Sequence, residues 1–285
     1  MIKYINYFFQ SIIIYIFFFI GRILGLTNSR KIFSNLFRIV GPIFKSKKTI
    51  NKNLDIFSSK VPNLNKDTII KNMWFNYGKT FIEYIFLGKM RKDDSLVTVV
   101  GDENLKKVIK KNKPVIFVSG HFANFELMSM EIVKKNIKLA TIYRPLNNVF
   151  LNPCMEFLRK TYVCDNQIKK GIKGVRNAID FIKKDFSIAL MIDQRVSEGK
   201  EINFFGKKAL TTTLPAQLSL KFNLEILPVF IKREKNDKFT IEFQEPLNKT
   251  KYKNKLELTL ELNKILEKMI EKNPYQWIWT HNRWK

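Results

Sequence analysis

Histidine and cysteine are both scarce in this sequence. The 285 residues include only two histidines, His121 and His281, and two cysteines, Cys154 and Cys164. The cysteine spacing does not match a zinc site, and two cysteines are too few for a disulfide framework. No glycine-rich dinucleotide fingerprint is present either. We therefore expect a reduced, cytoplasm-facing protein body with no metal and no bound cofactor.

Acidic residues are also few. Lysine and arginine number 51 against 25 aspartates and glutamates, which gives a formal net charge of +26. Such an excess indicates an anionic partner, which can be nucleic acid, anionic lipid or an acidic protein. Because Lys, Asn, Ile and Phe are all abundant, a genome rich in A/T codons also explains part of the excess, and charge alone selects no partner. The sequence lacks zinc-finger spacing, a helix-turn-helix pattern and RNA-binding strand motifs. We expect no nucleic-acid partner and keep a membrane-tethered nucleic-acid-binding protein as a remote alternative.

Charge is absent from Tyr4 to Ile20, and residues 12–20 form an unbroken apolar run. A spanning helix needs about 20 mostly apolar residues, and no small-residue cleavage site follows the run. We therefore predict a membrane anchor in residues 1–30, which either spans the bilayer or lies in its interface. One basic residue precedes the run, and seven follow it between Arg22 and Lys48. The positive-inside rule then predicts that residues 31–285 remain in the cytoplasm.

The remaining chain alternates between predicted strands and helices, without an internal repeat or a linker rich in Gly, Ser or Pro. Apolar runs and spacings predict helices at 51–88, 126–135, 154–160, 174–183, 213–222 and 256–270. Strands are predicted at 115–119, 139–143, 187–192, 226–232 and 238–243. This alternation predicts an α/β fold, in which a central, largely parallel mixed sheet is flanked by helices. Residues 31–285 are expected to form one catalytic domain.

One of the two histidines stands where a buried strand ends. The stretch from Ser119 to Glu126 begins at the end of a strand, turns at Gly120 and presents His121 before a predicted helix. Ligands of parallel α/β sheets bind at the carboxyl ends of the strands. A histidine there is suited to take a proton from an alcohol and pass it to a leaving thiolate. A carboxylate on the second ring nitrogen would fix the tautomer, and Glu126 can supply it if His121 lies in the turn before the helix.

Three further polar residues follow predicted strands and are expected at the same sheet edge. They are Arg144, Asp193 and Arg195, and we expect all three, with Asn124 beside His121, to contact the substrate. One arginine is suited to hold a lipid phosphate, because its planar guanidinium binds phosphate through two hydrogen bonds. The other can support the oxyanion or the catalytic loop, with Asp193 as its partner. A purely structural contact between Asp193 and Arg195 is an equal alternative.

The order of several motifs resembles a known enzyme family. The H-x-x-x-x-[D/E] signature is matched by His121 and Glu126, within the string Gly-His-Phe-Ala-Asn-Phe-Glu. The other motifs are Tyr-Arg-Pro-Leu-Asn-Asn from 143, Asp-Gln-Arg from 193, Phe-Phe-Gly from 204, three threonines from 211 and a closing Gln-Trp-Ile-Trp from 276. Together they resemble the lipid A biosynthesis acyltransferases, the lauroyl- and myristoyl-transferring late enzymes of the glycerolipid acyltransferase superfamily.

This resemblance implies an acyltransferase of the inner membrane. It implies an acyl carrier protein or coenzyme A thioester as the donor, and a hydroxyl of a lipid A precursor as the acceptor. His121 would remove the acceptor proton without a covalent enzyme intermediate, which leaves both cysteines without a chemical role. A phospholipid or glycolipid acceptor, or thioester hydrolysis, remains an alternative at this stage.

Overall fold

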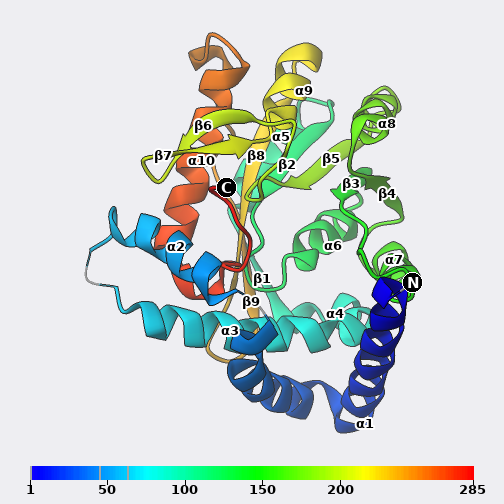
Figure 1. The fold of residues 1–285 in the computed structure, drawn as a ribbon. Coiled ribbons are helices and arrows are strands. Elements are labelled where there is room, and N and C mark those ends of the chain that lie inside the picture. The colour runs from blue at the N-terminus through cyan, green and yellow to red at the C-terminus, as the bar shows by residue number, and fades with distance from the viewer. Residues whose placement is uncertain (1, 45, 63) are drawn as a thin grey trace.

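The computed structural model describes residues 2–44, 46–62 and 64–285. A seven-stranded sheet lies between two groups of helices (Figure 1). The strands of this sheet are β1 (Val97–Val100), β2 (Val115–Ser119), β3 (Leu139–Tyr143), β4 (Asn166–Lys169), β5 (Ser187–Met191), β8 (Glu225–Arg233) and β9 (Phe239–Phe243). Their spatial order is β1-β9-β8-β2-β5-β3-β4.

Five of the six neighbouring strand pairs are parallel, and the β8–β9 pair alone is antiparallel. The predicted fold class, a largely parallel mixed sheet flanked by helices, is therefore confirmed. Strand β2 lies in the centre between β8 and β5, and its residues are buried on both faces. In the β2–β5 register Ser119 lies opposite Met191, so the residues that follow these two strands emerge next to one another.

The sheet separates two apolar clusters because successive side chains of a strand point to opposite faces. Ile116 and Val118 belong to one cluster, and Val115 and Phe117 belong to the other. The first face is covered by α2 (Lys47–Ser58), α3 (Lys66–Glu83), α8 (Ile172–Ile182), α9 (Leu214–Phe222) and α10 (Lys255–Lys272). The second face is covered by α4 (Leu87–Lys92), α5 (Asp102–Ile109), α6 (Glu126–Lys134) and residues at the end of α7 (Asn152–Tyr162).

The N-terminal helix α1 (Ile2–Phe44) bends at Gly25, which has a φ of 73° and a ψ of 168°. This positive φ favours glycine because it has no Cβ. Figure 1 shows the two halves of α1 meeting at an angle, with the second half running beside α3. The helix is long and apolar enough to cross a membrane. It continues past residue 30 without a break, so it joins the predicted anchor directly to the body, and the division at residue 30 stays a prediction.

Several regions differ from the sequence-based expectations, and β1, α5 and β4 were not among the predicted elements. The helix expected over 51–88 is divided into α2 and α3, and Asn65 caps α3 by accepting a hydrogen bond from the Thr68 amide. A two-stranded hairpin of β6 (Lys200–Phe204) and β7 (Lys207–Thr211) was not predicted. Its turn residues Phe205 and Gly206 both have positive φ, as a tight two-residue hairpin turn requires. Short one-turn helices complete the chain: η1 (Tyr84–Phe86), η2 (Asp94–Leu96), η3 (Lys249–Lys251) and η4 (Pro274–Gln276).

Candidate active site

His121 lies in the turn between β2 and α6, before the regular helix begins at Glu126. The histidine side chain is 19% exposed, so one part of the ring is held by the protein and another part reaches solvent. Its ring packs edge-on against Phe125, with 4.6 Å between the ring centroids. The predicted position of His121, at the carboxyl edge of the sheet and outside the helix, is confirmed.

The carboxylate that holds His121 is Asp193. Its Oδ1 lies 2.7 Å from Nδ1 of the histidine ring, and its Oδ2 accepts a hydrogen bond of 2.8 Å from the His121 backbone amide. His121 follows β2 by two residues and Asp193 follows β5 by two residues, and these strands are parallel neighbours in register. Their pairing therefore follows directly from the strand order of the sheet.

The charge state of Asp193 is set by its surroundings. Its side chain is fully buried, and burial alone raises the pKa of a carboxyl group. The charge of His121 and the hydrogen bonds from His121 and Trp277 outweigh this effect, and they lower the pKa of Asp193 to about 2. Asp193 is therefore an anion at neutral pH and is placed to orient the imidazole and to stabilise its protonated form.

Glu126 occupies a different position from the one expected. Its Oε1 accepts a 2.7 Å hydrogen bond from Nε of Arg159 and a 2.8 Å bond from the hydroxyl of Tyr84. Arg159 and Glu126 are both about one-tenth exposed, and a guanidinium buried this deeply needs an anionic partner. The contact between His121 and Glu126 that the sequence led us to expect is thus replaced by two separate pairs. The histidine is bonded to Asp193, and the glutamate is bonded to Arg159.

Asn124 anchors the turn that carries His121. The residue is 1% exposed, and its Nδ2 donates a 3.0 Å hydrogen bond to Glu83. Glu83 is fully buried between Arg30 and Arg233, and although burial alone raises its pKa, these two charges lower it. This contact ties the turn to α1, α3 and β8, and the expected substrate contact of Asn124 stays a prediction.

The backbone of the turn has one unusual residue, Ala123, with a φ of 45°. Its carbonyl accepts a hydrogen bond from Thr80, and its amide donates to the carbonyl of Gln276. Gly120 has no positive φ in this structure. A Cβ at position 120 would lie 2.8 Å from the Phe122 ring and 2.9 Å from Leu266. A Cβ there would force these side chains to shift, so glycine at this position provides space and its ability to adopt a positive φ is not used.

The C-terminal segment completes the site, a role that the sequence did not reveal. The indole of Trp277 donates a 2.9 Å hydrogen bond to Oδ2 of Asp193. Nε2 of His281 accepts a 2.9 Å bond from the backbone amide of Arg195. Burial, outweighing the opposing charge of Asp193, lowers the pKa of His281 to about 4, so this ring is neutral and remains an acceptor near neutral pH. The last residues of the chain therefore hold both ends of the Asp193–Arg195 segment. The sequence signals for this segment were the closing Gln-Trp-Ile-Trp motif and the second of the two histidines.

The two predicted arginines lie at different depths. Arg144 follows β3 and is exposed beside Lys170, and burial together with the charge of Arg144 lowers the pKa of that lysine. The Arg195 side chain is partly buried, and its Nε has no hydrogen-bond partner among the described residues. Since Asp193 is bonded to His121 and Trp277, the expected contact between Asp193 and Arg195 side chains is replaced by these bonds.

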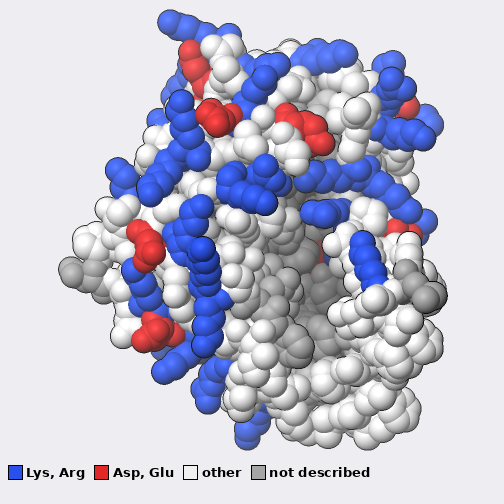
Figure 2. Space-filling view, viewed as in Figure 1, with Lys and Arg blue, Asp and Glu red and all other residues white. Residues whose placement is uncertain are grey.

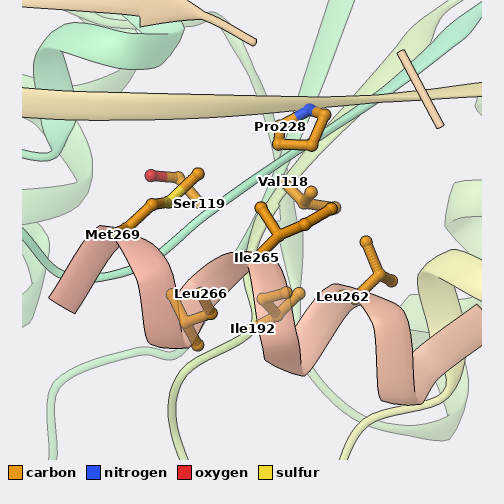
Figure 3. A pocket seen from close by; sticks show the side chains of 8 residues that line it. All are labelled: Val118, Ser119, Ile192, Pro228, Leu262, Ile265, Leu266 and Met269. Carbon is orange, nitrogen blue, oxygen red and sulfur yellow. The ribbon is translucent and has the colours of Figure 1, made fainter. Parts of the chain in front are cut away.

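Charged side chains are unevenly distributed over the surface around the site. Figure 2 shows basic side chains spread over the upper part of this face, above a hollow near its centre. The lower right, where α1 lies in Figure 1, is mostly uncharged. Below the strand ends, an apolar crevice lies between β2 and α10, with Ser119, Ile192 and Met269 among its lining residues (Figure 3). Its free volume of about 10 Å³ is enough for about one water molecule and too small for an acyl chain.

The described residues include no group of three or more His, Cys, Asp or Glu side chains arranged to hold a metal ion.

The arrangement can be compared with known proteins. The family model described as bacterial lipid A biosynthesis acyltransferase matches residues 2–285. The chain belongs to this family. The resemblance inferred from the sequence motifs is thereby confirmed. Among curated relatives of this chain are the lipid A biosynthesis palmitoleoyltransferase of Escherichia coli (strain K12) and a lipid A biosynthesis acyltransferase of Shigella flexneri.

Both relatives are 27% identical to this chain over 191 residues, which cover 66% of this chain and 61% of each relative. Among solved structures, the 1-acyl-sn-glycerophosphate (LPA) acyltransferase PlsC of Thermotoga maritima aligns with a TM-score of 0.43 and 14% identity. This alignment covers 89% of this family member and 100% of that chain.

Proposed function

We propose that this protein transfers a fatty acyl group from a thioester to a hydroxyl of a lipid A precursor. The observation that carries the proposal is the bond between His121 and Asp193 at the carboxyl edge of the sheet, in a chain of the lipid A acyltransferase family. A histidine oriented by a buried carboxylate is the arrangement that activates a hydroxyl nucleophile.

The proposed chemistry uses the outer nitrogen of the ring. The bonds of His121 to described residues involve its backbone amide and Nδ1, which leaves Nε2 for the substrate. Nε2 takes the proton of the acceptor hydroxyl, and the oxygen attacks the thioester carbonyl carbon. The carbon–sulfur bond then breaks, and the sulfur leaves as a thiol after taking the proton from the imidazolium. Asp193 stabilises the imidazolium between these steps.

Glu126 is proposed to act through Arg159. Its carboxylate and the Tyr84 hydroxyl fix the guanidinium, which also lies over the ring of Tyr143 at the end of β3. A cation fixed by these contacts is suited to stabilise negative charge on a substrate. This role keeps Glu126 important for activity although it does not contact the histidine.

The exposed cations are proposed to bind phosphate. Arg144 and Lys170 are neighbours on the rim, and the pantetheine arm of a carrier-protein or coenzyme A donor carries a phosphate, as does a lipid A precursor. Either donor fits this chemistry, and a carrier protein is the partner that the family resemblance implies. The basic residues that follow the apolar run support a position of the body on the cytoplasmic side of the inner membrane.

The test is product analysis with purified enzyme. A lipid A precursor is incubated with acyl carrier protein thioesters or with acyl coenzyme A, and the products are identified by mass spectrometry. We expect a lipid product heavier by one acyl group, formed by the wild type and at least about a hundredfold more slowly by His121→Ala. Release of free fatty acid alone would identify a thioesterase, and acylation of an added phospholipid or glycolipid would identify another acceptor. Either result would contradict the proposal.

A further inference from the structure

The first half of α1 packs along the protein body, although it is long enough to cross a bilayer. Residues 2–24 span about 35 Å at the rise of an α-helix, and a bilayer core is about 30 Å thick. Length therefore does not distinguish a spanning helix from one that lies in the interface. The contacts of this helix with the body do distinguish them.

Polar contacts tie the helix to the loop between β3 and α7. The Ser11 hydroxyl donates a 3.0 Å hydrogen bond to Oδ1 of Asn148, and Nδ2 of Asn148 donates a 2.8 Å bond to the carbonyl of Tyr7. The Tyr15 hydroxyl donates a 2.8 Å bond to the carbonyl of Phe150. One turn further, Phe18 belongs to an apolar cluster with residues of α3, η1 and α7.

The contacts continue to the far end of this half. Arg22 donates a 3.1 Å hydrogen bond to the carbonyl of Ile85, and a Cβ at Gly21 would lie 2.5 Å from Ile82. The helix thus contacts the body from Tyr7 to Arg22. If it crossed the bilayer, the loop around Asn148 would have to enter the hydrocarbon beside it, and exposed loop backbone is not tolerated there.

The opposite side of the helix is uniformly apolar. Its exposed residues recur every three or four positions, and Phe9, Phe19 and Ile23 are 57%, 68% and 71% exposed. At 100° per residue, the polar residues Gln10 and Arg22 fall within about 60° of the side that packs on the body. Figure 2 shows the region of α1 as mostly uncharged. Exposed Phe150, which packs against Phe8, extends this apolar surface onto the body.

We infer that the first half of α1 lies in one leaflet of the membrane, parallel to its surface, with both of its ends on the side of the catalytic body. The occupant of the apolar stripe is the acyl region of a bilayer, and the excess of basic residues elsewhere on the chain is complementary to anionic headgroups. The inference rests on the membrane association of the family and is independent of the acyl-transfer chemistry, so a failure of one does not imply a failure of the other.

Chemical labelling tests this orientation. Cys154 and Cys164 are replaced by serine, and single cysteines are introduced as Lys3→Cys or Lys47→Cys, on either side of the apolar run. A membrane-impermeant maleimide is then added to spheroplasts and to inverted membrane vesicles. We expect both cysteines to be protected in spheroplasts and labelled in inverted vesicles. Labelling of Lys3→Cys in spheroplasts, with Lys47→Cys protected, would show a spanning helix and overturn the inference.

Two further measurements complete the test. Ser11→Cys combined with Asn148→Cys should form a disulfide in the membrane-bound protein, and failure to form it would show that the helix does not pack on the body in the membrane. Phe9→Lys and Phe19→Lys should each reduce binding to anionic phospholipid vesicles at least tenfold, whereas Asn28→Lys, exposed beyond the kink, should not. The inference would also be overturned if the wild type formed a dimer that did not bind vesicles and that Phe9→Lys dissociated. The exposed apolar side of α1 would then be the contact surface for a second copy of the chain.

Discussion

Replacing Asp193 by asparagine should change the histidine tautomer and nearly abolish turnover. In the wild type, both carboxylate oxygens accept hydrogen bonds, from the His121 ring and backbone and from Trp277. Asparagine has the same size, but it replaces one oxygen by an NH₂ group. If that group faces Nδ1, then Nδ1 becomes an acceptor and the proton moves to Nε2. Nε2 could then no longer accept the proton of the substrate hydroxyl.

The expected loss in kcat is on the order of a thousandfold, which corresponds to about 4 kcal/mol. The equivalent Asp-to-Asn change in the catalytic triad of a serine protease costs about ten-thousandfold, and a thiol leaves more easily than an amine. Because fully buried Asp193 loses charge-assisted hydrogen bonds, stability should also fall by about 1 to 3 kcal/mol. Initial rates with saturating donor, circular dichroism and thermal unfolding separate the two effects.

The control is a kinetic double-mutant comparison. Asp193→Asn in a His121→Ala background should add little to the loss, since residues that act as a unit are not additive. Glu126→Gln in the His121→Ala background tests whether Glu126, in place of Asp193, acts as a unit with His121. The argument is refuted if folded Asp193→Asn retains activity within tenfold of the wild type, while Glu126→Gln adds nothing to His121→Ala.

The remaining predictions concern the residues around this pair. Trp277→Phe keeps the packing but removes the N–H donor to Asp193, so kcat should fall on the order of tenfold while KM stays unchanged. This role would be contradicted if Trp277→Leu and Trp277→Phe lost the same unfolding free energy and neither lost kcat. Glu126→Gln and Arg159→Gln should each cost about 2 to 3 kcal/mol in unfolding free energy, and the double variant should cost at least about 1 kcal/mol less than their sum; simple additivity would show that the pair is not coupled. Because the folded pKa of His281 lies near 4, below its ordinary 6.5, the unfolded chain binds the proton first as pH falls. Wild-type stability should therefore drop by about 2 to 3 kcal/mol between pH 6.5 and pH 4, and His281→Gln, which keeps an acceptor, should drop less over this range; identical urea-unfolding slopes against pH would refute it.

The sequence by itself determined most of the helices and buried strands and the position of His121 at the carboxyl edge of the sheet. Short continuous apolar runs such as residues 115–119 fit a strand that is covered on both faces of a sheet, so they predicted the buried strands. Strand–helix alternation then required a largely parallel sheet. His121 was located because parallel strands carry functional residues at their carboxyl ends. The uncharged N-terminal run was equally local information, since it depends only on consecutive residues.

Only the tertiary structure decided which side chains meet. Glu126 is close to His121 in sequence, but α6 begins at Glu126, and its carboxylate is bonded to Arg159 from α7. Asp193 is 72 residues from His121 and becomes its partner because β2 and β5 are neighbours in register. Strand order depends on how all the layers pack at once, and no local periodicity encodes it. The same reason explains why Trp277 and His281 could not be assigned: the C-terminal segment meets the Asp193–Arg195 segment only through contacts between residues far apart in the sequence.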